Sequence, residues 1–364
     1  MDLKNWGWDD RWESTFLELK TDGLVPGRVI ADSRHLYEVV VDGGRQSWSR
    51  PTGNLSARLA GTAGLPVTGD WVLVEANPRY TEWPIHDVLP RRSAMSRKSP
   101  TDALHAAGEQ VLAANVDYLF LVCGLDGGRN FTARGLERYL TAAWDSGALP
   151  VVVLNKADLA LDAEASLLEA QEVAAGADVV VTSSVTEHGV DPLAPYLQPG
   201  KTVALVGKSG VGKSTIINRL AGMELLATQA NREGDLRGRH TTTLRRMVRL
   251  PSGALLLDTP GLRQLALWGD EDAVDSTFSD IAELASECKF GDCSHRKEPG
   301  CAVQQALAEG ALDLARYESY LALQRELRYL QRKQDVKARL EQKARGKALS
   351  RHSKDWSRSS GKGH

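Results

Sequence analysis

The chain has 364 residues, 42% hydrophobic and 25% charged, a composition typical of globular proteins that excludes a mostly disordered chain. This length predicts two to three domains. There is no run of about 18 apolar residues as a membrane span requires, and the N-terminus lacks the basic and apolar regions of a signal peptide. We therefore expect a soluble, cytoplasmic protein with no membrane partner.

The net charge of −2 is unevenly distributed. Residues 325–364 contain thirteen Lys/Arg and four Asp/Glu, a net charge of +9, which leaves −11 for the rest of the chain. An acidic body with a basic tail favours contact with a polyanion, nucleic acid first. A solvated charged helix with a frayed end would explain the charge equally well.

The first 95 residues divide into two predicted units. Residues 1–20 carry three tryptophans among charged residues and are expected to form an N-terminal extension with a short helix packed on the body. Residues 21–95 contain short β-rich runs and a Gly43-Gly44 turn, without a helical stretch, which predicts a small β-barrel. An OB-fold is the first choice and an SH3-like barrel the alternative. The predicted strands are Gly27–Ile30, Leu36–Val41, Gly69–Glu75 and Ile85–Leu89.

Residues 96–275 show apolar strands alternating with helical segments, which predicts an α/β domain with a parallel sheet covered on both faces. A basic linker should precede it, formed by Arg91, Arg92, Arg97 and Lys98. The predicted strands are Tyr118–Gly124, Pro150–Leu154, Val179–Thr182, Val203–Val206 and Ala254–Leu257, and the predicted helices are Arg134–Trp144 and Ala163–Ala175. Residues 276–349 should form a small metal-binding and helical domain, with one long helix from about 303 to 345, and residues 350–364 a disordered basic tail.

The most specific motif is GKSGVGKS, between a predicted strand and a predicted helix. It meets the phosphate-loop pattern GxxxxGK[ST], in which glycines let backbone N–H groups surround phosphate oxygens and the helix directs its positive end at the anion. Lys213 is expected to neutralise the β- and γ-phosphates, and Ser214 to ligate Mg²⁺. The predicted phosphate-binding residues are Gly207, Lys208, Ser209, Gly210, Val211, Gly212, Lys213, Ser214 and Thr215.

Three further motifs complete a nucleotide site. Asp258, in Asp-Thr-Pro-Gly after the strand ALLLD, is expected to help hold Mg²⁺, and the N–H of Gly261 to contact the γ-phosphate. The sequence NKAD, residues 155–158, selects guanine, because an Asp158 carboxylate accepts hydrogen bonds from guanine N1–H and N2–H, a pair that adenine lacks. Asn155 should support the base, the Lys156 stem should cover a ring face, and Ser183-Ser184 should complete the pocket. A helix-capping role would also explain these serines.

The order of the motifs is circularly permuted. In Ras-type GTPases the phosphate loop comes first, whereas here NKAD and the serine pair precede it and DTPG comes last. Nucleotides bind beyond the carboxyl ends of parallel strands, so this rearrangement leaves the site intact. It also places the switch segments beside the C-terminal domain, so a change at the γ-phosphate is delivered directly into residues from 275 onward.

Residues 20–335 resemble the RsgA (YjeQ) family of ribosome small subunit-dependent GTPases, on the motifs NKAD, GKSGVGKST, GRHTTT and DTPG in this order. The resemblance implies an OB-fold, a permuted GTPase domain and a small zinc domain. It also implies a GTP hydrolase that binds the small (30S) ribosomal subunit and 16S rRNA and assists late maturation. Hydrolysis is expected to be slow until the subunit stimulates it.

Switch I should lie between Ala221 and Leu244. Three adjacent threonines, Thr241, Thr242 and Thr243, leave open which one binds Mg²⁺. Thr242 is the expected ligand, because the related motif PGTT has its metal-binding threonine second. Leu262 occupies the position of the glutamine that orients water in Ras-like enzymes, so it cannot fill that role. The resemblance implies that His240 replaces it, which makes His240, Thr242 and Lys213 the expected catalytic residues.

Three cysteines and a histidine form a compact cluster in the sequence: Cys288, Cys293, His295 and Cys301. Three thiolates and an imidazole suit one tetrahedral, structural Zn²⁺. Cys123, in an apolar strand, is expected in the core. Two other functions compete with a ribosome-dependent GTPase. A protein-binding signalling switch remains an alternative, and an ATPase or kinase is disfavoured by NKAD. We expect a monomer.

Overall fold

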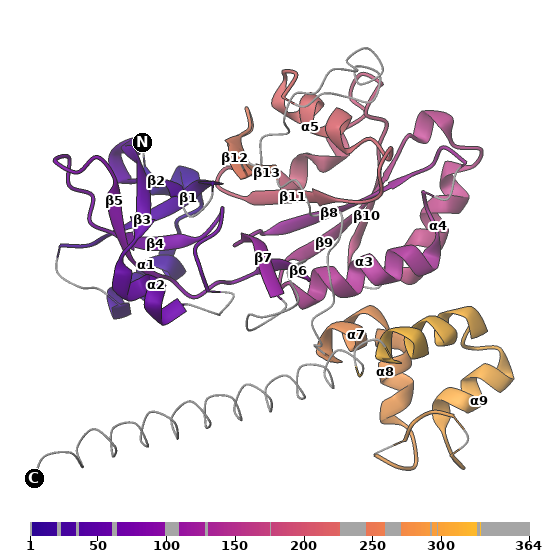
Figure 1. The fold of residues 1–364 in the computed structure, drawn as a ribbon. Helices are drawn as coiled ribbons and strands as arrows, with labels where there is room; N and C mark the ends of the chain where they lie inside the picture. Colours follow the sequence, from indigo (N-terminus) through magenta and orange to yellow (C-terminus); the bar gives the residue numbers. More distant parts are fainter. Residues whose placement is uncertain are drawn as a thin grey trace, which may run out of the picture.

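The computed structural model describes residues 2–19, 23–33, 36–59, 64–98, 109–127, 130–174, 176–225, 245–258, 271–291, 293–296, 298–325 and 328. Figure 1 shows an N-terminal barrel, a central sheet with helices and a group of C-terminal helices. Among the described residues, no helix has both the length and the hydropathy needed to cross a membrane.

The N-terminal barrel has five strands in the order β1-β2-β3-β5-β4, and β4 pairs with β1 to close it. The strands are β1 (Val25–Ser33), β2 (Leu36–Val41), β3 (Gln46–Pro51), β4 (Trp71–Val74) and β5 (Trp83–Val88). Parallel pairing of β3 with β5, and a helix between β3 and β4, complete the arrangement of an OB-fold. The OB-fold prediction is confirmed, with η2 (Asp42–Gly44) at the predicted turn.

The prediction missed two elements of this barrel. Strand β3 reads QSWSRP and gives no clean alternation, and helix α2 (Gly53–Leu59) contradicts the expectation that no helix is present. Helix α2 buries Leu55 against the barrel core, so one tertiary contact stabilises a segment of only two turns.

The predicted basic linker is wrong as a description of residues 91–98. Strand β6 (Ala94–Lys98) pairs with β7 (Glu109–Ala114) in a two-stranded sheet. Arg91 donates two hydrogen bonds to Asp70, at 2.8 and 2.7 Å, and Arg92 two to Asp9, at 2.6 and 2.7 Å. These partners lie far away in the sequence, so local composition could not reveal them. Arg97 and Lys98 belong to β6.

The central domain contains the six-stranded part of the sheet, in the order β10-β9-β8-β11-β13-β12. Its strands are β8 (Tyr118–Gly124), β9 (Leu149–Asn155), β10 (Asp178–Val181), β11 (Thr202–Val206), β12 (Arg245–Arg249) and β13 (Leu255–Asp258). The α/β prediction is confirmed, but the sheet is not wholly parallel because β12 runs antiparallel to β13. A short turn joins these two strands, whereas a parallel connection would need a longer crossover.

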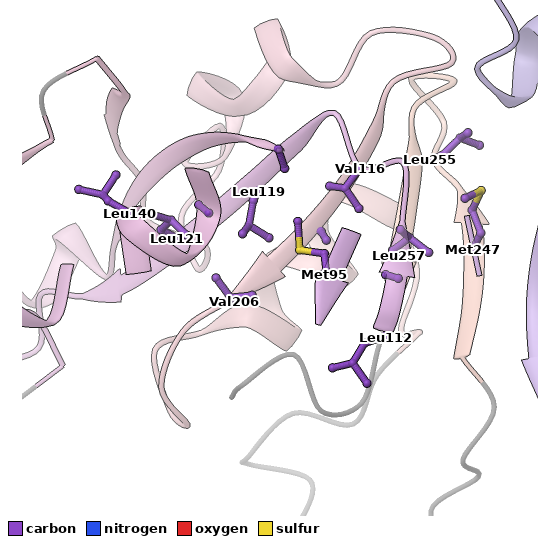
Figure 2. Close-up of a cluster of buried hydrophobic side chains, with 14 of the residues drawn as sticks. Met95, Leu112, Val116, Leu119, Leu121, Leu140, Val206, Met247, Leu255 and Leu257 are labelled. Carbon is purple, nitrogen blue, oxygen red and sulfur yellow. The ribbon is translucent and has the colours of Figure 1, made fainter. Parts of the chain in front are cut away.

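Helices cover both faces of this part of the sheet (Figure 1). The helices and turns are α3 (Ala133–Asp145), α4 (Ala163–Val173), α5 (Lys213–Ala221), η3 (Ala157–Leu159) and η4 (Asp191–Tyr196). Alternate residues of β8 face opposite ways, as a strand requires. Leu119 and Leu121 pack with Leu140 of α3, and Figure 2 shows these three side chains with Met95, Leu112 and Leu257. Phe120 and Val122 pack instead with α5 and η4.

The barrel and the central domain share one sheet. Strand β1 pairs antiparallel with β12, with Ala31 opposite Arg246 and Asp32 opposite Arg245. The N-terminal segment covers this junction with η1 (Leu3–Trp6) and α1 (Asp10–Leu19). Trp12 and Phe16 of α1 are buried in the same core as Trp71, so the predicted packed helix is confirmed.

The C-terminal part consists of α7 (Glu271–Thr277), α8 (Ser279–Ser286), α9 (Ala302–Glu309) and helical residues 314–325. The predicted single helix from 303 is wrong, because Gly310 adopts φ +73° and ends α9. Helix α7 packs against α3, which joins this part to the central domain (Figure 1). The basic tail beyond residue 328 lies outside the described residues.

Candidate functional site

The phosphate loop joins β11 to α5 and packs tightly against its neighbours. Gly207 has φ +146°, and a Cβ there would lie 2.2 Å from the Val122 carbonyl oxygen of β8. Gly212 has φ +98°, and a Cβ there would lie 2.2 Å from Asn155 Nδ2. Both positions therefore require glycine, for the backbone angle and for the space.

The loop combines exposed backbone with a positive charge. Lys208, Ser209 and Gly210 are exposed, whereas Val211 is buried in the core beneath them. Lys213, at the start of α5, donates from Nζ to the carbonyl oxygens of Gly207 (2.8 Å) and Lys208 (2.5 Å). Ser214 and Thr215 follow in the first turn of α5 and are partly exposed. This arrangement brings the ammonium group and the helix N-terminus to one place, which suits an anion.

Asn155 connects three of the predicted motifs. It ends β9, is fully buried and donates from Nδ2 to the carbonyl of Val211 (2.8 Å) and to Ser184 Oγ (3.3 Å). Its Oδ1 accepts from Ser184 N at 3.1 Å and from Thr182 Oγ1 at 3.2 Å. The asparagine therefore holds the phosphate loop and the serine loop together, although these segments are far apart in the sequence.

The rest of the NKAD motif faces the surface beside this asparagine. Lys156 has φ +65° and directly precedes the turn η3, whose middle residue is Asp158. Asp158 is exposed, and its Oδ1 accepts a 2.5 Å hydrogen bond from Ser183 Oγ. The predicted base-reading aspartate thus has one oxygen engaged by the serine loop, and both groups lie at the carboxyl ends of neighbouring strands.

The sequence patterns did not reveal Asp126. It follows β8, and its Oδ2 accepts a 2.5 Å hydrogen bond from Lys156 Nζ, while Oδ1 accepts one from Asn130 Nδ2 at 3.0 Å. The Lys156 ammonium holds the pKa of Asp126 below its usual value. An acidic residue two positions after the end of an apolar strand of an α/β sheet was the available signal. Asp126 orients the lysine stem that is expected to cover the base.

Several predicted site residues fall outside the described part of the chain. They are His240, Thr242 and Gly261. The backbone of Asp258 is described and ends β13, where it pairs with Arg246 of β12. That position lies at the same sheet edge as the phosphate loop, since β13 runs parallel to β11.

The four predicted metal ligands converge. Their ligand atoms all lie within 4.8 Å of one another. Cys288 Sγ is 3.9 Å from Cys301 Sγ and 3.5 Å from His295 Nδ1, and Cys301 Sγ is 3.7 Å from His295 Nδ1. A tetrahedral zinc ion with Zn–S near 2.3 Å and Zn–N near 2.0 Å separates its ligands by about 3.5–3.8 Å. The cluster therefore has the spacing to hold a tetrahedral metal ion.

Surrounding groups fix the orientation of this cluster. The carbonyl oxygen of His295 accepts hydrogen bonds from Gln304 Nε2 (2.6 Å) and Tyr317 Oη (2.5 Å). Burial lowers the pKa of His295, which favours the neutral imidazole that a metal requires. Cys123 is buried in the core as predicted, and burial raises its pKa to about 12.

Comparisons with known proteins agree with these features. The model of the RsgA GTPase family matches residues 88–268. The small ribosomal subunit biogenesis GTPase RsgA of Opitutus terrae is 46% identical over 351 residues, 94% of each chain. Its namesake from Syntrophotalea carbinolica is 40% identical over 371 residues, with all of both chains covered.

Two solved structures share the architecture. YjeQ from Thermotoga maritima has 26% identity and a TM-score of 0.61, covering 84% of this chain and 98% of that one. YloQ, described as a circularly permuted GTPase, has 25% identity and a TM-score of 0.60, covering 84% and 96%. The chain belongs to the RsgA family of GTPases, as the permuted order of its motifs predicted.

Proposed function

We propose that the protein hydrolyses GTP to GDP on the small ribosomal subunit and assists the late maturation of that subunit. The observation that supports this most directly is Asn155, which bonds the phosphate loop to the serine loop and so assembles one nucleotide pocket from permuted motifs. The relatives named above are small-subunit biogenesis GTPases, which supports the same partner. We expect the protein to act as a monomer in the cytoplasm.

Base selection is assigned to the NKAD loop. One oxygen of Asp158 is held by Ser183, which orients the carboxylate towards guanine N1–H and N2–H. Lys156, held by Asp126, covers the base with its apolar stem. Asn155 and Ser184 support the loop from beneath.

Binding of the phosphates and Mg²⁺ is assigned to the phosphate loop and the two motifs that follow it in the chain. The phosphate loop binds the phosphates through residues 207–215, with Lys213 leaving its loop carbonyls to reach the β- and γ-oxygens. Ser214, Asp258 and Thr242 hold Mg²⁺, and Gly261 contacts the γ-phosphate. His240 orients the attacking water, because Leu262 cannot. Hydrolysis is therefore slow until the subunit orders switch I, which costs about 1–2 kcal/mol per residue fixed.

The barrel and the C-terminal part are assigned to RNA. On β3, Trp48 and Arg50 are both exposed, and the exposed Arg45 directly precedes the strand, a combination of aromatic and cationic groups that suits stacked bases and phosphates. The Cys₃His cluster holds one structural Zn²⁺, and the domain it stabilises contacts 16S rRNA together with the basic tail. Our domain division remains 1–20, 21–95, 96–275, 276–349 and 350–364.

The decisive experiment is sedimentation of the full-length protein with purified small subunits on a sucrose gradient. With a non-hydrolysable GTP analogue the protein should co-migrate with the subunit, and with GDP it should stay largely free. Asp158→Asn should lose the GTP-analogue effect and regain it with the xanthine analogue, because the amide presents a donor where guanine requires an acceptor. Migration as free protein in every nucleotide state would instead favour a protein-binding signalling switch.

A further inference from the structure

The tryptophan-rich N-terminal segment forms one wall of a pocket at the junction of the barrel and the central domain. Trp8 stacks on Trp12 at 6.5 Å between ring centroids and meets Trp71 of β4 edge-on at 4.6 Å. Gly7 approaches the loop before β11 so closely that a Cβ there would lie 2.7 Å from the carbonyl oxygen of Gly200. This segment is therefore fitted to both domains at once.

The pocket has a volume of about 180 Å³ and is lined by residues of the N-terminal segment, the barrel and the central domain. The lining includes Lys4, Trp8, Arg28, Arg92, Asp117 and Lys201. It lies at the opposite end of β11 from the phosphate loop, because Thr202 begins that strand and Gly207 follows its end. The pocket is thus separate from the nucleotide site.

Arg28 is the unusual residue of this pocket. It is only 2% exposed, and its guanidinium packs over the ring of Trp71 at 4.8 Å. Its Nη2 donates to two neutral acceptors, the carbonyl oxygen of Asn115 (3.1 Å) and Thr202 Oγ1 (3.3 Å). Among the described residues, Nε is buried without a hydrogen-bond partner. Nη1 lies towards Gly7, where a Cβ would be 3.7 Å away.

The carboxylates near Arg28 already have cations of their own. Asp9 pairs with Arg92 at 2.6 Å, and Asp70 pairs with Arg91 at 2.7 Å. Asp117 accepts from the Thr202 N–H at 2.8 Å and lies 3.4 Å from Lys201 Nζ. Arg28 is therefore a surplus buried cation, and the exposed Lys4 at the same pocket adds a second.

A buried cation bonded only to neutral groups is costly unless an anion lies close to it. Burial lowers the pKa of Arg28 to about 10, with Asp117 and Asp70 opposing that shift, so the side chain stays charged at neutral pH. The missing counter-charge has to reach a guanidinium that is almost inaccessible from the surface. A phosphate on the outside of a folded RNA helix would contact Lys4 and Lys201 but could not reach Arg28.

We infer that this junction pocket is a binding site for a small free oxyanion of the phosphate class, held by Arg28 and Lys4 and covered by Trp8. Arg28 supplies the charge-assisted hydrogen bonds, Lys4 closes the outer side, and the indole excludes water from one face. The ligand would act as an electrostatic bridge between the barrel and the central domain.

The test uses the full-length protein with its nucleotide site saturated by GDP and Mg²⁺. Inorganic phosphate is titrated at constant ionic strength while tryptophan fluorescence is followed. The wild type should show a saturable change. Lys4→Glu should weaken binding about tenfold through charge reversal at an exposed site, whereas Arg79→Glu, an exposed cation on a barrel loop, should leave it unchanged. Trp8→Phe should reduce the amplitude of the signal with little effect on affinity.

Arg28→Met should abolish phosphate binding, and its thermal unfolding should be measured to establish that the variant is folded. Because Lys4 is exposed, its variant tests the site even if Arg28→Met is unstable. A dinucleotide with one phosphodiester should fail to compete. No saturable change in the wild type, equal affinity in Lys4→Glu, or binding of the dinucleotide independent of Arg28 would each overturn the assignment.

Discussion

The central domain is joined to its two neighbours by different kinds of interface. The barrel is attached through backbone pairing of β1 with β12 and through aromatic rings of the N-terminal segment. The C-terminal part is attached through side chains centred on Arg316, which donates to Asp280 (2.6 and 2.7 Å) and to Glu137 of α3 (3.2 Å). Backbone pairing fixes a register, whereas a side-chain network separates without breaking a sheet.

Both interfaces use elements that follow the nucleotide motifs in the chain. Strand β12 comes directly after the predicted switch I, which lies between Ala221 and Leu244, and α7 comes after the Asp-Thr-Pro-Gly motif that begins at Asp258. A change at the γ-phosphate would therefore reach the barrel through a hydrogen-bonded strand and the C-terminal part through a buried ion-pair network. We therefore expect a single side-chain substitution to loosen the interface of the C-terminal part more readily than the β1–β12 interface.

The largest effect should come from removing the metal. Structural zinc contributes on the order of 10 kcal/mol to the folding of small zinc domains. Cys293→Ser should lower the zinc content from about one per chain and unfold the C-terminal part, while GTP affinity and the barrel remain nearly unchanged. Metal analysis and limited proteolysis measure this, with Cys123→Ala as a thiol control that retains the metal. Loss of the barrel in Cys293→Ser would show that the two junctions are not independent.

Next in size is Arg316→Met, which leaves Glu137 buried at 2% exposure without its cation. Breaking a buried ion pair costs about 3–5 kcal/mol, and we expect the lower end because Asp280 is partly exposed. Chemical denaturation should show an earlier transition of the C-terminal part. Arg325→Met, an exposed position on the same helical segment, should have little effect. Adding Glu137→Gln should restore part of the loss, and no restoration would contradict the network.

A smaller loss is expected at the barrel junction from Gly7→Ala. The left-handed φ of +87° and the contact with the Gly200 carbonyl should together cost about 1–3 kcal/mol. Gly23→Ala separates these causes, because Gly23 has φ +83° but an added methyl there would meet nothing within 4 Å. Thermal unfolding should therefore rank Gly7→Ala as the more damaging change. Equal losses would mean that the close approach to Gly200 contributes nothing.

The smallest expected effect is a dependence of the unfolding free energy on pH. Burial raises the pKa of Glu137 above 4.5, with Arg316 opposing the shift, so the folded protein binds this proton more tightly than the unfolded chain. Its contribution to stability is present below pH 4.5 and is lost as pH rises through the folded pKa. As pH rises across that window, the unfolding free energy of the wild type should fall relative to that of Glu137→Gln. The variant has no carboxyl group at this position and should not show this fall. A difference independent of pH would show that Glu137 does not titrate there.

Local sequence patterns predicted much of this molecule. Strands β2 and β8 have their predicted bounds, since Leu36–Val41 and Tyr118–Gly124 are rich in aliphatic and aromatic residues. The metal ligands also converge as expected, because close spacing in the sequence limits how far apart they lie. Family membership followed from the permuted order of four short motifs.

What the patterns missed depends on partners far away in the chain. Arg92 was predicted to belong to a linker because its partner Asp9 lies 83 positions earlier in the sequence. Arg28 likewise donates a hydrogen bond to Thr202, 174 positions later. The periodicity of apolar residues indicates which face of a helix or strand is buried, but it does not indicate which charged side chains pair with each other. Asp126 was overlooked for the same reason, since its importance becomes visible only beside Lys156.

The antiparallel pairing of β1 with β12 also bears on how the chain can be divided. A strand at the edge of a sheet presents unpaired N–H and C=O groups that recruit other strands. Here the end of β1, at Ala31 and Asp32, covers the outer edge of β12 in the central sheet. Cutting the chain between the two domains would uncover that edge of β12, whereas the barrel stays closed by the pairing of β1 with β4. The separately expressed central domain should therefore self-associate even where it folds, and the separate barrel should not.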